Sequence, residues 1–263
     1  MSTPTSFRRQ EILLQARFHG ADGAGPLPTV LLLQGSPGNE EDVLGLGANF
    51  AQNGYNVLTF NYSGTHRSEG LSSFANSQLD IAAAYRFLHE TEALQIDRDH
   101  LILGGWSYGG GMALTYAANH PEVTAVFSIA GTDHGEFMRE YVRDVNYRRM
   151  VDQIFDEMTE PDSPWRLAPG ATPRELVDQH VDIDEYDLRL VASRLVNKNI
   201  LIVGGWDDLN VKIDNHLLPL YRTLRSEGAR QVSMLAFQDG HGFEKVREEL
   251  AGAILEWMDS AVS

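Results

Sequence analysis

The feature that most constrains the fold is a short apolar run that ends in a glycine-rich turn around one serine. The run Leu101–Leu103 leads into this turn, where Gly105 and Gly109 lie two residues either side of Ser107, and a helix-forming segment begins near Met112. This order predicts a buried strand, a very tight turn and a helix, with the pattern G-x-S-x-G at the turn. The glycines let the strand and helix pack closely, while the serine takes strained backbone angles that hold its hydroxyl above the strand end.

Apolar strands alternate with helical segments along most of the chain. The predicted strands, beside the one before the serine, are Glu11–His19 as an edge strand, Thr29–Leu33, Val57–Phe60, Val123–Ile129, Ile200–Val203 and Val232–Phe237. The predicted helices include Glu40–Gln52, one opened by a Ser77/Asp80 capping box, Lys212–Glu227, and a last one with an apolar face from Phe243 to Trp257. Such alternation predicts an α/β fold with a mostly parallel, twisted sheet covered on both faces by helices.

The alternation is lost between residues 132 and 187. This segment is charged and helix-like, and prolines interrupt it at Pro161, Pro164, Pro169 and Pro173. We therefore expect a first core part over residues 1–131, a helical insertion over 132–187, and a second core part over 188–263.

Composition excludes several classes of function. The chain has 263 residues and a formal net charge of −16, which disfavours nucleic acid and anionic membrane surfaces as partners. It contains no cysteine, so disulfides, thiol catalysis and thiolate metal sites are excluded. The N-terminal residues lack an apolar signal core, and no apolar run approaches membrane-spanning length. We expect a cytoplasmic protein, and a homodimer is compatible with the sequence.

Four loops that follow predicted strands carry residues typical of nucleophilic catalysis. They contain Gln34–Asn39, Ser107, the pair Asp207/Asp208, and His241. The carboxyl ends of parallel strands share one edge of a sheet, so these loops are expected to converge. A serine hydroxyl needs a base to become a nucleophile, histidine is the natural base near neutral pH, and a carboxylate fixes the histidine tautomer. From the residues alone, either aspartate could be the acid.

The same chemistry needs backbone N–H groups to hold a developing oxyanion. The N–H of Tyr108, directly after the serine, is the first candidate, and the N–H of Ser36 is the second, because Pro37 has none. The sequence lacks a His-x-x-x-His pattern and a calcium-loop pattern, and no Gly-Lys-Ser/Thr follows the glycines. We therefore expect no metal and no cofactor.

At these residues the chain resembles the α/β-hydrolase superfamily, and more narrowly its prolyl-oligopeptidase and dienelactone-hydrolase-like branches. Three segments carry the resemblance: the turn Gly105–Gly110, the acid loop Gly205–Val211 and the histidine loop Asp239–Phe243. Phe60–Gly70 is similar to the F-x-x-R-G-x-G-x-S-x-G loop of small members, with Ser63 and His66 departing from it. The G-x-x-D-x-x-V register of the acid loop implies Asp208 as the acid. Gln34-Gly35 stands where members usually have His-Gly.

The resemblance implies a Ser107–Asp208–His241 triad and a helical cap in the inserted segment. It implies a serine hydrolase that cleaves a small ester, thioester or activated amide through an acyl-serine intermediate. The cap is expected between the sixth and seventh strands of the family's numbering. Candidate substrate-binding residues are His66, Phe137, Met138, Tyr141 and Trp165.

Two alternatives stay open. One is a small aminopeptidase or acyl-peptidase, in which a cap carboxylate such as Glu136, Glu140 or Asp144 grips a substrate amine. There is no room for the propeller domain of the large peptidases. The other alternative is a slow-turnover small-molecule binding protein that keeps the fold and the triad.

Overall fold

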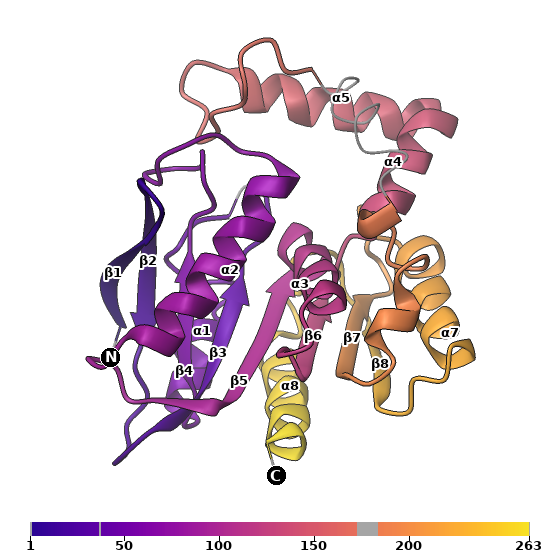
Figure 1. Ribbon diagram of the computed structural model, residues 1–263. Coiled ribbons are helices and arrows are strands. Elements are labelled where there is room, and N and C mark those ends of the chain that lie inside the picture. Colours follow the sequence, from indigo (N-terminus) through magenta and orange to yellow (C-terminus); the bar gives the residue numbers. More distant parts are fainter. Residues whose placement is uncertain (1, 37, 173–183, 263) are drawn as a thin grey trace.

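An eight-stranded sheet organises the molecule, with helices on both of its faces (Figure 1). The computed structural model describes residues 2–36, 38–172 and 184–262. Its strands are β1 (Ser2–Arg9), β2 (Ile12–His19), β3 (Leu27–Leu33), β4 (Asn56–Phe60), β5 (Ile96–Trp106), β6 (Ala125–Ile129), β7 (Asn199–Gly205) and β8 (Val232–Phe237). Its α-helices are α1 (Leu46–Gln52), α2 (Phe74–Glu90), α3 (Tyr108–Asn119), α4 (His134–Arg143), α5 (Val145–Thr159), α7 (Leu218–Ser226) and α8 (Arg247–Ala261).

The sheet has the order β1-β2-β4-β3-β5-β6-β7-β8. Strands from β4 to β8 pair in parallel, whereas β1 and β2 are antiparallel to their neighbours. Every residue of β4 and β6 is buried, as expected for parallel strands that are covered on both faces, and most of these residues are apolar. The mostly parallel α/β fold expected from the sequence is confirmed.

The predicted edge strand is not at the edge. β2 lies between β1 and β4, and β1 forms the edge instead. β1 is built from Ser2-Thr3-Pro4-Thr5-Ser6, a polar stretch without a strand-like apolar signal, and it buries mainly Phe7 and Arg9. Pairing along its whole length with β2, rather than its own propensity, fixes this strand.

Two predicted helices have different starting points in the structure: α1 begins later than expected, and α2 begins earlier. The segment from Glu40 is not helical until Leu46, because the Asp42 carboxylate accepts hydrogen bonds from the N–H groups of Val43 and Gly47 and closes a local turn. α2 begins at Phe74 and is capped by Ser73, whose side chain accepts from the N–H of Asn76. The proposed Ser77/Asp80 capping box is therefore wrong.

The predicted helix Lys212–Glu227 is divided. Its first part is a π-helical turn, η3 (Ile213–Leu217), and α7 follows, with Pro219 in its first turn. Two short 3₁₀ turns, η1 (Asp184–Tyr186) and η2 (Ala192–Leu195), lead back from the inserted segment to β7.

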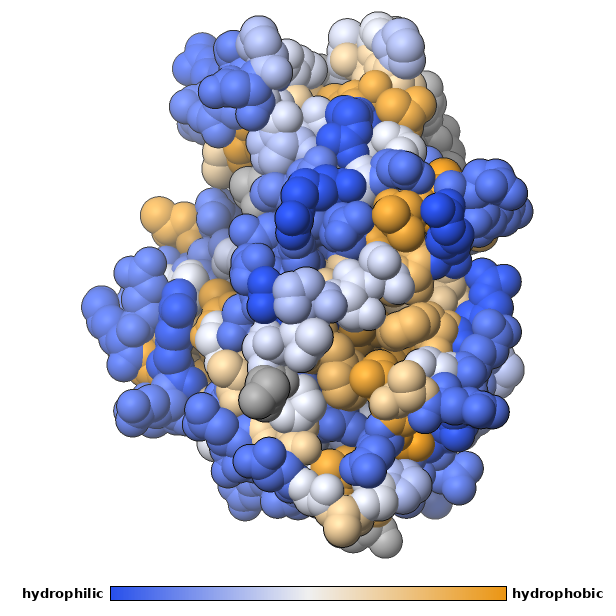
Figure 2. All heavy atoms as spheres, turned by 90° about the vertical axis from the view of Figure 1, so that its left-hand side faces the viewer, coloured by the Kyte–Doolittle hydropathy of each residue, from blue (hydrophilic) through white to orange (hydrophobic). Residues whose placement is uncertain are grey.

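The inserted segment follows β6 and lies across the end of the sheet where the parallel strands point (Figure 1). α4 and α5 form a small apolar core of their own from Met138, Tyr141, Tyr147 and Val151. Of the prolines named above, Pro37 and Pro173 lie outside the described residues. Among the described residues no helix is both long and apolar enough to span a bilayer. On the face seen in Figure 2, hydrophilic side chains cover most of the surface and surround a smaller apolar area.

Candidate active site

The tight turn predicted around Ser107 is present between β5 and α3. Ser107 has φ 56° and ψ −121°, a left-handed backbone conformation that is strained for a residue with a side chain. A Cβ at Gly109 would overlap the carbonyl oxygens of Leu33 and Gln34 in the neighbouring strand and its loop. The Ser107 N–H donates to the carbonyl of Ile129 in β6 at 2.8 Å, which anchors the turn to the sheet. The strand, turn and helix thus fix the serine at the carboxyl end of β5.

The three residues of the expected triad meet at this end of the sheet. His241 Nε2 lies 2.9 Å from Ser107 Oγ, and His241 Nδ1 lies 2.7 Å from Asp208 Oδ2. With the Nδ1–H tautomer, the imidazole donates to the carboxylate and accepts from the serine hydroxyl. The Asp208 side chain is fully buried, and its Oδ1 accepts from the N–H groups of Asn210 and Val211. These bonds fix the carboxylate that faces the imidazole.

Asp207 points away from the histidine. Its exposed carboxylate accepts from the Gln238 side-chain amide at 3.0 Å, and its N–H donates to the Asp239 carbonyl. The geometry therefore brings Asp208, and not Asp207, to His241.

Trp106 was not expected to take part in the site. Its indole N–H donates to the His241 carbonyl at 2.9 Å, and its ring lies 5.2 Å from the imidazole. A Cβ at Gly35 would meet the same indole at 2.7 Å. Trp106 thus contacts both the histidine loop and the loop after β3. Only its position next to Ser107 could have indicated this role from the sequence.

The two proposed oxyanion donors lie at the serine. Ser36 and Tyr108 both line the cavity that contains Ser107. Tyr108 is the first residue of α3, where backbone N–H groups have no acceptor within the helix. The side-chain amide of Gln34 is not available as a further donor to an oxyanion, because it is buried and donates to the Phe60 carbonyl at 2.8 Å.

A cavity of about 280 Å³ lies between Ser107 and the inserted segment. Four of the proposed substrate-binding residues, His66, Phe137, Met138 and Trp165, line it. Tyr141 does not: it is buried in the contact between α4 and α5, and its hydroxyl donates to Asp152 at 2.7 Å. His66 has a second contact, because its Nε2 lies 2.8 Å from the Gly38 carbonyl and is placed to donate to it.

Five cavity-lining residues come from α5 and were not named from the sequence. They are Tyr147, Met150, Ile154, Phe155 and Met158. Their recurrence on one side of the helix, at intervals of three, four, one and three residues, is the signal that could have identified them within a segment interpreted mainly by its charge. Among the described residues no group of three or more His, Asp or Glu side chains is arranged to hold a metal ion.

Comparison with known families identifies the family to which this fold belongs. The family model for the alpha/beta hydrolase fold matches residues 28–173, and the chain therefore belongs to that family. No curated protein sequence matches the chain.

Several solved structures are similar in fold. Est1E from Butyrivibrio proteoclasticus is 14% identical, with 98% of each chain covered and a TM-score of 0.69. The esterase PF2001 of Pyrococcus furiosus is 15% identical and has a TM-score of 0.72, with 100% of this chain and 92% of that one covered. The acylaminoacyl peptidase of Pyrococcus horikoshii is 17% identical and has a TM-score of 0.72, with 98% of this chain but only 41% of that one covered. At these identities the likeness concerns the fold.

Proposed function

We propose that this protein is a serine hydrolase that cleaves a small ester, thioester or activated amide through an acyl-Ser107 intermediate. The observation that carries the proposal is the continuous chain of contacts from Ser107 through His241 to Asp208. The proposed partner is a small-molecule substrate, bound in the cavity between the strand ends and the inserted segment, which acts as a cap.

In the proposed reaction, Ser107 Oγ attacks the substrate carbonyl carbon while its proton passes to His241 Nε2. The former carbonyl oxygen becomes an oxyanion, which the N–H groups of Ser36 and Tyr108 would hold. The bond to the leaving group then breaks, and His241 returns the proton to that group. A water molecule, deprotonated by His241, attacks the acyl carbon and releases the acid and free Ser107. Asp208 stays ionised throughout and stabilises the imidazolium.

The aminopeptidase alternative requires a carboxylate of the inserted segment at the cavity, and the three candidate carboxylates have other partners. Glu136 pairs with three arginines, Glu140 contacts Asn215 and His216, and Asp144 caps α5 through the N–H groups of Asn146 and Tyr147. None of these three carboxylates lines the cavity, so none is placed to grip a substrate amine. We therefore favour ester hydrolysis.

Steady-state hydrolysis of p-nitrophenyl esters, run beside aminoacyl nitroanilides, tests the proposal. We expect ester turnover to exceed nitroanilide turnover, and Ser107→Ala to lose on the order of 10⁶ in kcat. Asp208→Asn should lose about 10⁴, because the imidazole would then hold the wrong tautomer. The matched control Asp207→Asn should change kcat little. Preferred nitroanilide turnover would favour the peptidase alternative, and Ser107 labelling by a fluorophosphonate without measurable turnover would favour a binding protein.

A further inference from the structure

We propose that the cavity beneath α5 binds an uncharged, apolar acyl group, aliphatic or aromatic, and discriminates against acyl groups that carry a charge. This inference rests on the proposed acyl transfer to Ser107 and adds the substrate class. Three features of the described residues support it: the face of α5, the degree to which that face is covered, and the chemistry of the cavity wall.

The face of α5 that meets the cavity is an apolar stripe. The five lining residues of this helix recur at intervals of three, four, one and three positions from Tyr147 to Met158, which places them on one side of an α-helix. The charged residues of α5 fall between them, at Arg148, Arg149, Asp152, Asp156 and Glu157. The helix therefore separates an apolar side from a polar one.

The stripe is wider than α4 can cover. Tyr147 and Val151 are buried in the apolar core that α5 shares with α4. Ile154 is 43% exposed, and Met150, Phe155 and Met158 are only half-buried, although all four line the cavity. Apolar surface left open next to the candidate nucleophile is surface that an apolar ligand would remove from water.

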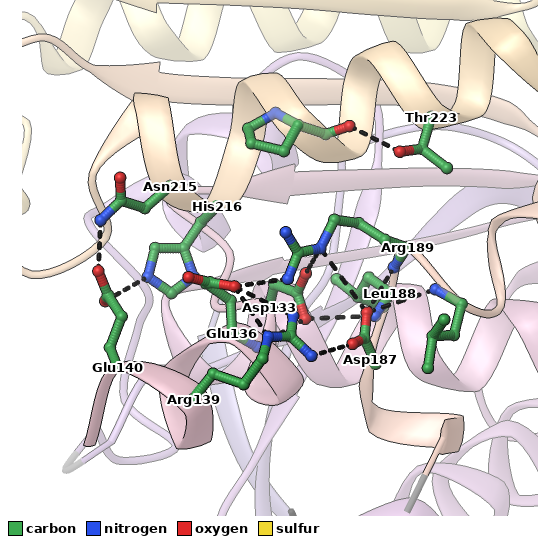
Figure 3. Close-up of polar contacts among 12 residues, drawn as sticks. Asp133, Glu136, Arg139, Glu140, Asp187, Leu188, Arg189, Asn215, His216 and Thr223 are labelled. Atoms are coloured by element: carbon green, nitrogen blue, oxygen red, sulfur yellow. Dashed lines mark hydrogen bonds and ion pairs between the residues drawn. The ribbon is translucent and has the colours of Figure 1, made fainter. Parts of the chain in front are cut away.

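The described part of the cavity wall offers no charged side chain to receive a charged group. Among the described residues that line it, none is Asp, Glu, Lys or Arg. The charged residues of α4 point elsewhere: Glu136, Arg139 and Glu140 pair with Asp187, Arg189, Asn215 and His216 at the base of the inserted segment (Figure 3).

The polar groups of the wall are hydroxyls, side-chain amides and imidazoles, and the three imidazoles already have partners. His241 faces Ser107 and Asp208, His66 faces the Gly38 carbonyl, and His134 packs against the rings of Phe74 and Tyr108. A carboxylate or ammonium placed among these groups would lose its hydration without gaining an Asp, Glu, Lys or Arg side chain as a partner.

Methionine side chains contribute to the apolar part of the cavity wall. Met138, Met150 and Met158 line the cavity together with the aromatic rings of Phe74, Phe137 and Trp165. Methionine side chains are unbranched and adapt to ligands of different shape. The acyl site should therefore accept a range of apolar chains rather than one.

The test uses p-nitrophenyl esters that differ only in the acyl group, so that any trend reports the acyl site. From acetate to hexanoate, kcat/KM should rise by up to about fourfold for each methylene buried. p-Nitrophenyl succinate, whose acyl group ends in a carboxylate, should have a kcat/KM at least about 100-fold below that of the neutral pentanoate. A flat chain-length series, or a succinate rate equal to the pentanoate rate, would overturn the inference.

A pair of adjacent variants locates the effect on α5. Ile154→Lys puts a cation into the apolar stripe, and it should lower hexanoate kcat/KM at least tenfold while narrowing the gap between succinate and pentanoate. Gln153→Lys adds the same charge at the neighbouring exposed position, outside the lining residues. It should change neither the hexanoate kcat/KM nor the ratio of the succinate kcat/KM to the pentanoate kcat/KM. Circular dichroism of both variants checks folding. Equal behaviour of the two variants would contradict the placement of the acyl group under α5.

The outcomes separate this inference from the proposed function. Loss of acetate hydrolysis in Ser107→Ala tests the serine mechanism, whatever the acyl preference. If acetate hydrolysis depends on Ser107 but the acyl series is flat, the serine hydrolase stands and only the acyl-site assignment fails.

Discussion

At the scale of single residues, Trp106 connects parts of the candidate site that come from distant parts of the chain. It precedes Ser107, donates its indole N–H to the His241 carbonyl, and lies against Gly35 in the loop after β3. Neither contact involves the reacting atoms of the proposed mechanism. We therefore interpret Trp106 as a positioning residue that holds the imidazole at the distance required for proton transfer.

The variant Trp106→Phe keeps an aromatic ring but removes the N–H donor. We expect kcat for ester hydrolysis to fall about fivefold with little change in KM, since one hydrogen bond of about 1 kcal/mol positions the base rather than the substrate. Trp257→Phe is the matched control, because Trp257 also donates one indole hydrogen bond, to Asn199 at 3.0 Å, on α8 away from the site. Equal losses of kcat in the two variants would contradict the positioning role.

The contacts that join Ser107, His241 and Asp208 could be predicted because each residue follows an apolar strand and stands in a recognisable local motif. The choice between Asp207 and Asp208 needed either the family register or the fold, because both residues occupy the same short loop. The hydrogen bond from Trp106 to His241 could not be predicted, since it depends on how close the loop after β8 lies to the end of β5. The prediction that Tyr141 binds substrate in the cavity was wrong, because α4 directs that side chain toward α5 instead.

At the scale of elements, a buried ion pair joins β1 to α2. Arg9 Nε lies 2.6 Å from Asp80 Oδ1, and the Asp80 carboxylate also accepts from the N–H and the hydroxyl of Ser63 at 2.7 Å. Burial raises the pKa of the Asp80 carboxyl, and the contacts with Ser63 and Arg9 oppose that shift. Ser63 stands where the similar family loop has Arg, and here a guanidinium reaches this loop from β1 instead. This pairing could not be predicted, because β1 itself was not predicted.

Removing one partner of this pair should be more harmful than removing both. Arg9→Met leaves the Asp80 carboxylate buried without its cation, and should lower the free energy of unfolding at pH 7 by about 3–5 kcal/mol. Arg9→Met combined with Asp80→Asn should recover part of that loss, because no charge is then buried. Thermal or urea unfolding of the single and double variants measures the difference. A double variant less stable than Arg9→Met would contradict this account.

A second contact between elements binds the inserted segment to the loop after β4. Thr65 and Trp165 form an antiparallel bridge, the His66 N–H donates to the Pro164 carbonyl, and the Arg166 guanidinium donates to the carbonyls of His66 and Ser68. Because His66 also contacts Gly38, this segment supports the loop that carries Ser36. The segment lies next to prolines, and nothing in its local sequence indicated a strand-like pairing.

The guanidinium of Arg166 is the part of this contact that a substitution can remove. Arg166→Met should loosen residues 64–68 and increase the rate of trypsin cleavage after the exposed Arg67, as measured by mass spectrometry of limited digests. Arg149→Met, at an exposed position of α5, serves as the control and should not change that rate. An unchanged rate in Arg166→Met would mean that the backbone contacts alone hold the loop.

At the scale of the whole molecule, a cluster of charged residues joins both ends of the inserted segment to the core (Figure 3). Asp133 Oδ1 accepts from the N–H of Leu188, so the residues that enter and leave the segment are connected directly. Arg189 pairs with Asp133 and Glu136, and Glu140 of α4 contacts Asn215 and His216 of η3, which follows the acid loop. The inserted segment and the loop that carries Asp208 are therefore held by the same cluster of charged and polar residues.

This cluster should make stability depend on pH. Burial, and then the charge of Asp187, raise the pKa of Asp133 to about 6, above the value of about 3.9 for an unfolded chain. The folded state thus binds more protons between these values, so the contribution of Asp133 to stability falls as pH rises from about 4 to about 6. The change is on the order of 2 kcal/mol. Asp133→Asn should remove it.

The measurement compares the unfolding midpoint temperatures of wild type and Asp133→Asn at pH 4.5 and pH 7. The difference between the two proteins should shift in favour of the variant at pH 7 by several degrees. A constant difference at both pH values would show that Asp133 does not titrate in this range.

The overall architecture was predictable because strands alternate with helices, and the loss of that alternation marked the inserted segment. The orientation of α5 over the site was not predictable, since it depends on packing against α4 and on the ion pairs at the base. The acyl preference that we propose for the cavity beneath α5 thus depends on the whole molecule rather than on any one motif.

The central claim is that Ser107 forms a covalent acyl intermediate. Intact-protein and peptide mass spectrometry, after rapid acid quench of a reaction with p-nitrophenyl hexanoate, tests it most directly. We predict a mass increase of one hexanoyl group on the peptide that contains Ser107 in wild type, and no such peptide in Ser107→Ala. Ester turnover that persists in Ser107→Ala, or an acyl group found on another residue, would contradict the account.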